Sequence, residues 1–155
     1  MIKHEEAALM KKTENGANDA IEKTAKLLAG AKKVYLATNG SHGHPNLRAI
    51  SPAKAEGART VWFAVHADSN KISELVNDNH AVIYFDAPRM GGEFRLWGFV
   101  EILDDMESRK KIWGKDYEEF FPDGGIESPS LRVLRFDAVN GTYMNKNMET
   151  FPFEF

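Results

Sequence analysis

A long β-strand is indicated by Phe94-Arg95-Leu96-Trp97-Gly98-Phe99-Val100-Glu101-Ile102-Leu103. Every second residue from Phe94 onward is apolar or glycine, which is the period-two pattern of a strand with one buried face. The opposite face carries Trp97 and Phe99, two large aromatic side chains that are poorly accommodated in water. We expect that face to meet a partner subunit, a flat aromatic ligand or a helix of the same chain.

Similar strand-like runs occur on both sides of this stretch, separated by turn signals. They cover residues 33–38, 45–51, 60–65, 81–85 and 131–137. The run 81–85 is apolar on both faces, which predicts a central strand. Asn140-Gly141 is typical of a turn, after which residues 142–144 would pair back.

Three helices are predicted around these strands. The first begins at Asp19, which together with Glu22 has the character of a capping box, and it ends at Gly30. The polar composition before it predicts a loose N-terminal segment at residues 1–17. The other two helices are expected to begin near residues 68–69 and to run from a cap at Asp104, with Glu107, to Trp113.

Many short strands with a few flanking helices favour a mainly β fold, an antiparallel barrel that is closed or nearly closed, with one helix inserted after the third strand. A doubly wound parallel sheet is disfavoured, because strands and helices do not alternate regularly and no Gly-x-Gly-x-x-Gly follows a strand. A length of 155 residues suits one domain, residues 1–155. Its aromatic C-terminal tail, residues 145–155, is expected to pack, for example on a partner subunit.

The composition excludes several classes of function. The chain has 20 Lys and Arg against 23 Asp and Glu, a net charge of −3, which argues against a nucleic-acid partner. No apolar run approaches the roughly 20 residues of a membrane span, and no signal peptide is recognisable, so we expect a cytoplasmic protein without a membrane partner. The absence of cysteine excludes disulfides, thiolate metal sites and cysteine nucleophiles.

The segment from Trp62 to Lys71 is a candidate anion site. A strand ends there, a short loop follows, and a helix begins near Asp68 or Ser69. Free backbone N–H groups at a helix start bind anions, and the Ser69 hydroxyl adds a donor. Lys71 is unusual in a first turn, because the helix dipole disfavours cations there; a bound phosphate would remove the conflict. An ordinary Ser or Asp cap beside an exposed lysine fits the same residues.

Arg48 is a second candidate for the same anion. It lies in the run from Pro45 to Pro52, and if this strand neighbours the Trp62–Val65 strand its guanidinium could reach the phosphate. The flanking prolines are equally typical of an edge strand with a surface arginine.

Other chemistries have little support. His42 and His44 have a spacing that can bind one metal ion, but no third ligand is evident, so no metal site is predicted. No Gly-x-Ser-x-Gly elbow is present, and no side chain is assigned a catalytic role.

In their order and spacing, these segments resemble the pyridoxamine 5′-phosphate oxidase-like family of FMN-binding split barrels, and more closely its small general stress protein branch. The resemblance covers about residues 21–144. It rests on Tyr35–Thr38, Pro45–Pro52, Phe63–Lys71, Ala81–Phe85, Trp97–Glu101, Ile112–Gly114 and Phe120–Pro122. It implies an antiparallel split β-barrel with Greek-key-like connections and a homodimer that binds FMN at its interface.

The resemblance also implies roles for nine residues. Arg48 would reach the FMN phosphate, and the backbone of Ala49, Ile50 and Ser51 would line the flavin ring. The remaining positions are Ala64 and Val65, beside the ring, and Ser69, Asn70 and Lys71, at the phosphate. The implied activity is that of a flavoprotein oxidoreductase acting on an unknown small molecule, with the redox chemistry supplied by FMN.

Two departures from the family pattern concern the substrate. The Arg-x-His near the carboxyl end of the true oxidase has no counterpart, since residues 145–150 read Asn-Lys-Asn-Met-Glu-Thr. The family's frequent Gln before the fifth strand aligns near Glu93. A true pyridoxamine 5′-phosphate oxidase is therefore not expected. The alternatives are a non-enzymatic flavin or haem binder, with an axial ligand among His42, His44, His66 and His80, and a related barrel that uses a deazaflavin or no cofactor.

Overall fold

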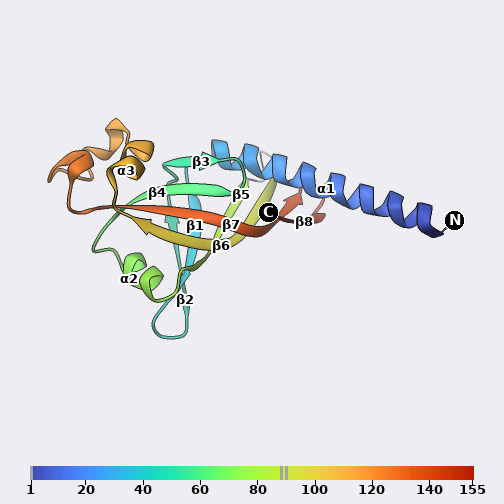
Figure 1. Cartoon of the computed structure of the whole chain (residues 1–155), viewed down its shortest axis with the longest axis horizontal. Helices are drawn as coiled ribbons and strands as arrows, with labels where there is room; N and C mark the ends of the chain where they lie inside the picture. Colours follow the sequence, from blue (N-terminus) through green and yellow to red (C-terminus); the bar gives the residue numbers. More distant parts are fainter. Residues whose placement is uncertain (1, 88, 90) are drawn as a thin grey trace.

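A computed structural model of the chain describes residues 2–87, 89 and 91–155. Within these residues, three α-helices and eight strands follow one another along the chain (Figure 1). Their order is α1 (Ile2–Gly30), β1 (Val34–Asn39), β2 (Pro45–Ile50), β3 (Lys54–Glu56), β4 (Thr60–His66), α2 (Asn70–Asn77), β5 (His80–Ala87), β6 (Gly92–Leu103), α3 (Met106–Ile112), β7 (Leu131–Asn145) and β8 (Thr150–Glu154). Short 3-10 turns, η1 (Lys115–Tyr117) and η2 (Gly125–Glu127), separate α3 from β7.

The eight strands form one antiparallel sheet. Its order is β2-β1-β5-β6-β7-β4-β3, and β8 pairs with β7 beside this path. β2 and β3 lie at the two ends of the path, so within the described residues no ladder joins these ends. The mainly β, antiparallel split-barrel fold predicted from the sequence is confirmed.

The core lies on the inner face of the curved sheet. As the alternation predicts, Phe94, Leu96 and Val100 of β6 are buried, whereas Phe99 on the other face is 42% exposed. β5 lies between β1 and β6, which confirms it as a central strand. Glycine is required at position 98, where the pairing of β6 with β7 shifts register, because a Cβ there would stand 2.1 Å from the carbonyl oxygen of Asp137.

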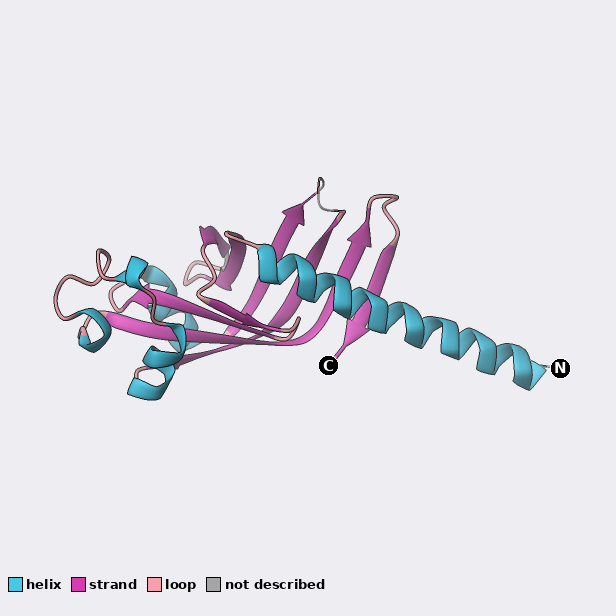
Figure 2. Cartoon of the chain, turned by 90° about the horizontal axis from the view of Figure 1, so that it is seen from above, coloured by secondary structure: helices cyan, strands magenta, loops and turns pink. Residues whose placement is uncertain are grey.

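The prediction for the N-terminal segment is wrong. α1 begins at Ile2 rather than at Asp19, so residues 2–17 are helical and not loose. Asp19 does not cap the helix; its carboxylate pairs with Lys23 one turn later, at 2.8 Å. Figures 1 and 2 show α1 crossing one side of the sheet, with its N-terminal half extending beyond it.

The predicted turn at Asn140-Gly141 is also wrong, because β7 continues through it to Asn145. Gly141 is present for packing: a Cβ there would lie 2.7 Å from a Leu96 side-chain atom and 2.8 Å from the Phe153 ring. The chain turns instead at residues 146–149, and β8 returns along β7.

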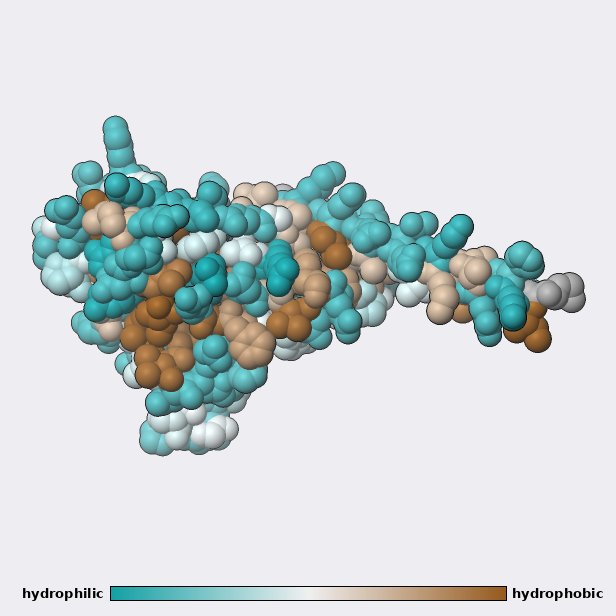
Figure 3. All heavy atoms as spheres, in the orientation of Figure 1, coloured by the Kyte–Doolittle hydropathy of each residue, from teal (hydrophilic) through white to brown (hydrophobic). Residues whose placement is uncertain are grey.

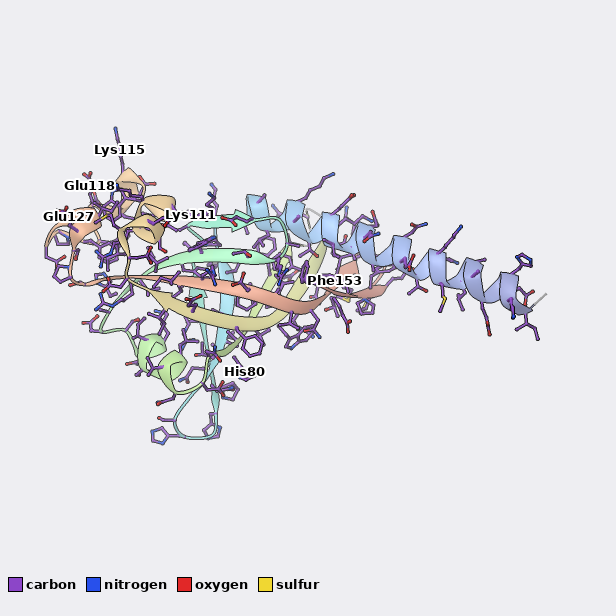
Figure 4. All side chains as sticks on the ribbon, in the orientation of Figure 1. His80, Lys111, Lys115, Glu118, Glu127 and Phe153 are labelled. Atoms are coloured by element: carbon purple, nitrogen blue, oxygen red, sulfur yellow. The ribbon has the colours of Figure 1, made fainter. Side chains whose placement is uncertain are left out.

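The aromatic tail packs within its own chain. Phe153 of β8 is buried in the main core, and α1 lies against β8 (Figure 4).

At α3, the N-cap residue is Asp105 rather than the predicted Asp104, since the Asp105 carboxylate accepts a hydrogen bond from the Ser108 backbone N–H. None of the helices in the described residues has the length and hydropathy needed to cross a membrane.

Candidate functional site

The turn between β4 and α2 has an unused hydroxyl group. β4 ends at His66, and Ser69 is the N-cap residue of α2, but its side chain forms no capping hydrogen bond. The Ser69 Oγ atom is buried and has no partner among the described residues. Because a buried hydroxyl without a partner costs free energy, this atom is suited to a ligand that accepts a hydrogen bond.

Lys71 lies in the first turn of α2 and is half-buried. Within the described part of the chain its ammonium forms no ion pair. Burial lowers the pKa of Lys71, the positive charge of Arg48 lowers it further, and Glu74 acts in the opposite direction. Two cations therefore lie near each other at the positive end of a helix dipole, an arrangement that a bound anion would stabilise.

Arg48 reaches α2 from the edge strand β2. Its Nη1 donates to Thr38 Oγ1 at 2.6 Å, and its Nη2 donates to Glu74 Oε2 at 3.1 Å. The side chain of Arg48 is 22% exposed, so part of the guanidinium remains accessible. The expected pairing of this strand with β4 is wrong, because β2 pairs with β1 and β4 pairs with β3 and β7. Arg48 nevertheless reaches α2 through Glu74, where its charge acts on the predicted lysine.

Glu74 is the buried counter-ion of this cluster. Besides Arg48, it accepts hydrogen bonds from Thr38 Oγ1 and from Asn46 Nδ2, the latter at 2.8 Å. Burial alone would raise the pKa of Glu74, but the three hydrogen bonds and the Arg48 charge hold it below its ordinary value. Glu74 is therefore ionised at neutral pH, and Arg48, Lys71 and Glu74 together carry one positive charge in excess.

Sequence reasoning missed Thr38, Asn46 and Glu74. A signal was present in β2, because Asn46 and Arg48 are two residues apart and must share a face. Another was present in α2, where Glu74 lies one turn after Lys71. The contact between the two elements could not be read from either pattern.

The other six predicted residues fall into two groups: some are exposed, and the others pack in the protein core. Ala49 and Ser51 are exposed at the edge of the sheet, and Asn70 is exposed at the start of α2. Ile50 packs against the main core, where Val65 is buried, whereas Ala64 packs against a second cluster of Trp62, Ile112 and Val133. The side chains of Ala64 and Val65 are thus used in packing.

The outer face of the sheet carries a row of side chains in register. It crosses β2, β1, β5, β6 and β7 through Leu47, Ala37, Val82, Trp97 and Asn140. Leu47 is 68% exposed, and Val139 and Phe99 beside the row are also exposed. In Figure 3 an apolar area covers α2 and the neighbouring end of β6. An uncovered apolar face of this kind is typical of an interface.

This face is hollowed beside Trp97. The cavity measures about 340 Å³ and is lined mainly by apolar side chains, including Trp97, Phe99 and Val139. His80 also lines it, with its ring tilted against that of Phe99 at 4.6 Å between ring centroids, near the β1–β2 hairpin (Figure 4).

An aspartate orients the His80 ring. His80 Nδ1 lies 2.6 Å from Asp78 Oδ1, and the His80 backbone N–H donates to the same oxygen at 3.0 Å. These bonds, together with one from Asn39, lower the pKa of Asp78 to about 2. Asp78 is therefore ionised at neutral pH, so His80 Nδ1 is the donor and Nε2 is left for another partner.

Glu93, at the start of β6, belongs to the same outer face. It accepts a hydrogen bond from the Tyr84 hydroxyl at 2.7 Å, which raises the pKa of Tyr84 to about 12. The Arg95 guanidinium lies over the rings of Tyr84 and Trp97, at 5.6 and 5.9 Å. The Glu93 carboxylate is thus partly satisfied by the Tyr84 hydroxyl of the neighbouring strand.

The chain matches a known protein family over most of its length. The family model described as pyridoxamine 5′-phosphate oxidase like matches residues 19–154. A solved structure from Clostridium acetobutylicum, of a protein related to general stress protein 26 (pyridoxinephosphate oxidase family), is 28% identical, with a TM-score of 0.75 over 84% of this chain and 90% of that chain.

Two further structures share the fold at lower identity. General stress protein 26 from Bacillus anthracis is 16% identical, with a TM-score of 0.70 over 83% of this chain and 95% of that one. A heme binding protein from Mycobacterium smegmatis is 14% identical, with a TM-score of 0.71 over 86% of this chain and 57% of that one. A search of curated proteins found no significant match.

Proposed function

Because the chain belongs to the pyridoxamine 5′-phosphate oxidase-like family, we propose that it is an FMN-binding flavoprotein that acts as an oxidoreductase on a small molecule. The observation that carries this proposal is the buried Ser69 hydroxyl, which has no partner among the described residues, two positions before the half-buried Lys71, whose ammonium is influenced by the charge of Arg48. Three donors of this kind at a helix N-terminus suit the phosphate of FMN.

The residues present fit a phosphate in number and in charge. Ser69 Oγ and the Lys71 ammonium have no partner among the described residues, and Arg48 retains N–H groups beyond those that bind Thr38 and Glu74. The one excess positive charge of the cluster favours an anion. Ser69 and Lys71 would bind the phosphate, and Arg48 would add a charge-assisted hydrogen bond.

The flavin ring would lie along the edge of the sheet. β2 pairs with β1 on one side only, so the backbone of Ala49, Ile50 and Ser51 has polar groups that the sheet does not use. These groups would orient the ring, with Ala64 and Val65 beside it, and Asn70 would lie at the phosphate. When bound, FMN supplies the electron transfer.

We expect the substrate to differ from pyridoxamine 5′-phosphate. Residues 150–154 form β8, which packs beneath α1, and the segment before it carries no Arg-x-His. The chain therefore lacks the pair that would hold a second phosphate and a pyridine ring.

A homodimer is part of the proposal. The row from Leu47 to Asn140 leaves an apolar face of the sheet uncovered within its own chain. A second copy of the same face would bury it, as expected for a two-fold interface.

An FMN titration tests the proposal. Protein freed of bound small molecules is mixed with FMN, and binding is followed by quenching of flavin fluorescence and by the visible spectrum. We expect saturable binding of FMN and much weaker binding of riboflavin, which lacks the phosphate. A colourless preparation that does not respond to FMN would remove the proposal.

A haem-binding function is the second candidate. It is favoured by His80, whose Nε2 is left for another partner, at the rim of an apolar cavity. Axial histidines commonly donate their other ring N–H to an oxygen acceptor, as His80 does to Asp78. Titration with hemin would give a sharp absorption band that His80→Ala abolishes, whereas an FMN site would leave this variant able to bind flavin.

A further inference from the structure

Arg48 is held in place by a closed set of hydrogen bonds that the implied flavin contacts do not include. Thr38 Oγ1 accepts from Arg48 Nη1 and donates to Glu74, which also accepts from Arg48 Nη2 and from Asn46. The four side chains come from three elements: β1, β2 and α2.

This network holds the Glu74 carboxylate in a buried position, where ionisation costs desolvation free energy. Glu74 is only 9% exposed, and burial opposes its ionisation. A buried ion pair is weak evidence for stability, because desolvation offsets much of the attraction. A role in fixing the position of a neighbouring group is an alternative to stability, and the bonds of Glu74 to Thr38, Asn46 and Arg48 suit it.

We propose that Glu74 is a positioning residue: by fixing the Arg48 guanidinium where its charge acts on Lys71, it makes the site select a phosphorylated flavin over the unphosphorylated one. This inference rests on the proposed function. Arginine has a long, flexible side chain on an edge strand, and binding would otherwise have to order it. Glu74 and Thr38 order the guanidinium before the ligand arrives, which is the general means by which preorganisation raises affinity.

Lys71 provides the contrast within the same site. Its ammonium has no partner among the described residues, so nothing comparable holds it. The two cations thus differ, because hydrogen bonds to Thr38 and Glu74 fix the direction of the Arg48 guanidinium, whereas Lys71 supplies positive charge without such bonds among the described residues.

The test compares FMN with riboflavin. Dissociation constants of both are measured by fluorescence quenching for the wild type, Glu74→Ala and Thr38→Val, with Glu118→Ala as a control at an exposed glutamate outside the site. We expect Glu74→Ala to weaken FMN binding at least about tenfold while riboflavin changes less than about twofold. Thr38→Val keeps the shape and the charges, and should reduce the preference for FMN in the same direction by a smaller factor.

Each outcome decides the matter. If both flavins weaken by the same factor in Glu74→Ala, the residue only supports the fold and the inference is overturned. Tighter FMN binding in that variant overturns it too, because Glu74 would then act as a competing negative charge. If Glu74→Ala does not fold, Thr38→Val decides by the same ratio. A wild type that binds FMN and riboflavin equally would instead refute the phosphate site itself.

Discussion

The guanidinium of Arg48 lies 3.1 Å from the carboxylate of Glu74, although 26 positions separate the two residues in the chain. This pair connects the free edge of the sheet to α2, the helix whose first turn carries Lys71. The ion pair therefore determines where the fixed positive charge of the candidate phosphate site lies.

Replacing Lys71 by Ala should weaken FMN binding. The loss of a charge-assisted hydrogen bond is worth about 1.5–3 kcal/mol, or roughly ten- to a hundredfold in affinity. Riboflavin binding should be unchanged. Lys115→Ala, at an exposed lysine of η1 outside the site, is the matched control in the same fluorescence titration. Equal FMN affinity in both variants would refute the assigned role of Lys71.

Replacing Ser69 by Ala should separate stability from binding. The Ser69 hydroxyl is buried, has no partner in the part of the chain that the structure describes and does not cap α2, so its removal should leave the unfolding free energy of the flavin-free protein unchanged or raise it by up to about 1 kcal/mol. FMN affinity should fall about tenfold, because one phosphate donor is lost. Urea unfolding and FMN titration measure the two quantities. A less stable flavin-free protein would show that the hydroxyl has a partner in solution.

Acid should destabilise the wild type more than Glu74→Gln. The Glu74 pKa is below its ordinary value of 4.5 in the folded chain, so the unfolded chain binds more protons in this range and stability rises with pH. The contribution of Glu74 is fully present above about pH 4.5 and is lost as the pH falls through the lower, folded pKa. Thermal midpoints measured from about pH 6 to pH 3 should converge for the two proteins. Parallel curves would mean that Glu74 does not titrate differently on unfolding.

Replacing Gly98 by Ala should destabilise the fold severely. The added Cβ would stand 2.1 Å from the Asp137 carbonyl oxygen, and two paired backbones cannot both move aside. We expect a loss of at least about 3 kcal/mol, or failure to fold. Gly114→Ala is the control, since its nearest contact would be an ordinary 3.9 Å from the Tyr117 ring. Chemical denaturation compares the two variants, and equal denaturation midpoints would show that the paired strands β6 and β7 can move apart at Gly98.

Replacing Leu47 by Asp should dissociate the proposed homodimer. Leu47 begins the outer-face row and is 68% exposed in one chain, so the substitution should leave the fold of one subunit intact. A charge at the interface would remain unpaired and desolvated, favouring the monomer. Light scattering after gel filtration should show the change for Leu47→Asp but not for Leu9→Asp, at a leucine of α1 that is 66% exposed and lies outside the row. A dimer that survives the substitution would place the interface elsewhere.

Local patterns predicted much of the fold because strands and helices follow side-chain periods. The alternation of β6 and the apolar run of β5 gave the correct faces and the correct central position. The errors arose where one local signal has two physical causes. Asn140-Gly141 is typical of a turn, but Gly141 is there because Leu96 and Phe153 leave no room for a Cβ. Asp19 is typical of a cap, but in a longer helix it serves as the partner of Lys23.

The sequence by itself determined the antiparallel strands, their buried faces and a helix start that combines a serine with a lysine, because each depends on residues close together in the chain. Only the tertiary structure decided that Glu74 meets Arg48, that the Ser69 hydroxyl is buried with no partner among residues 2–87, 89 and 91–155, and that the aromatic tail completes the sheet of its own chain. These depend on which elements pack together, and that is set by the burial of the whole core rather than by any local period.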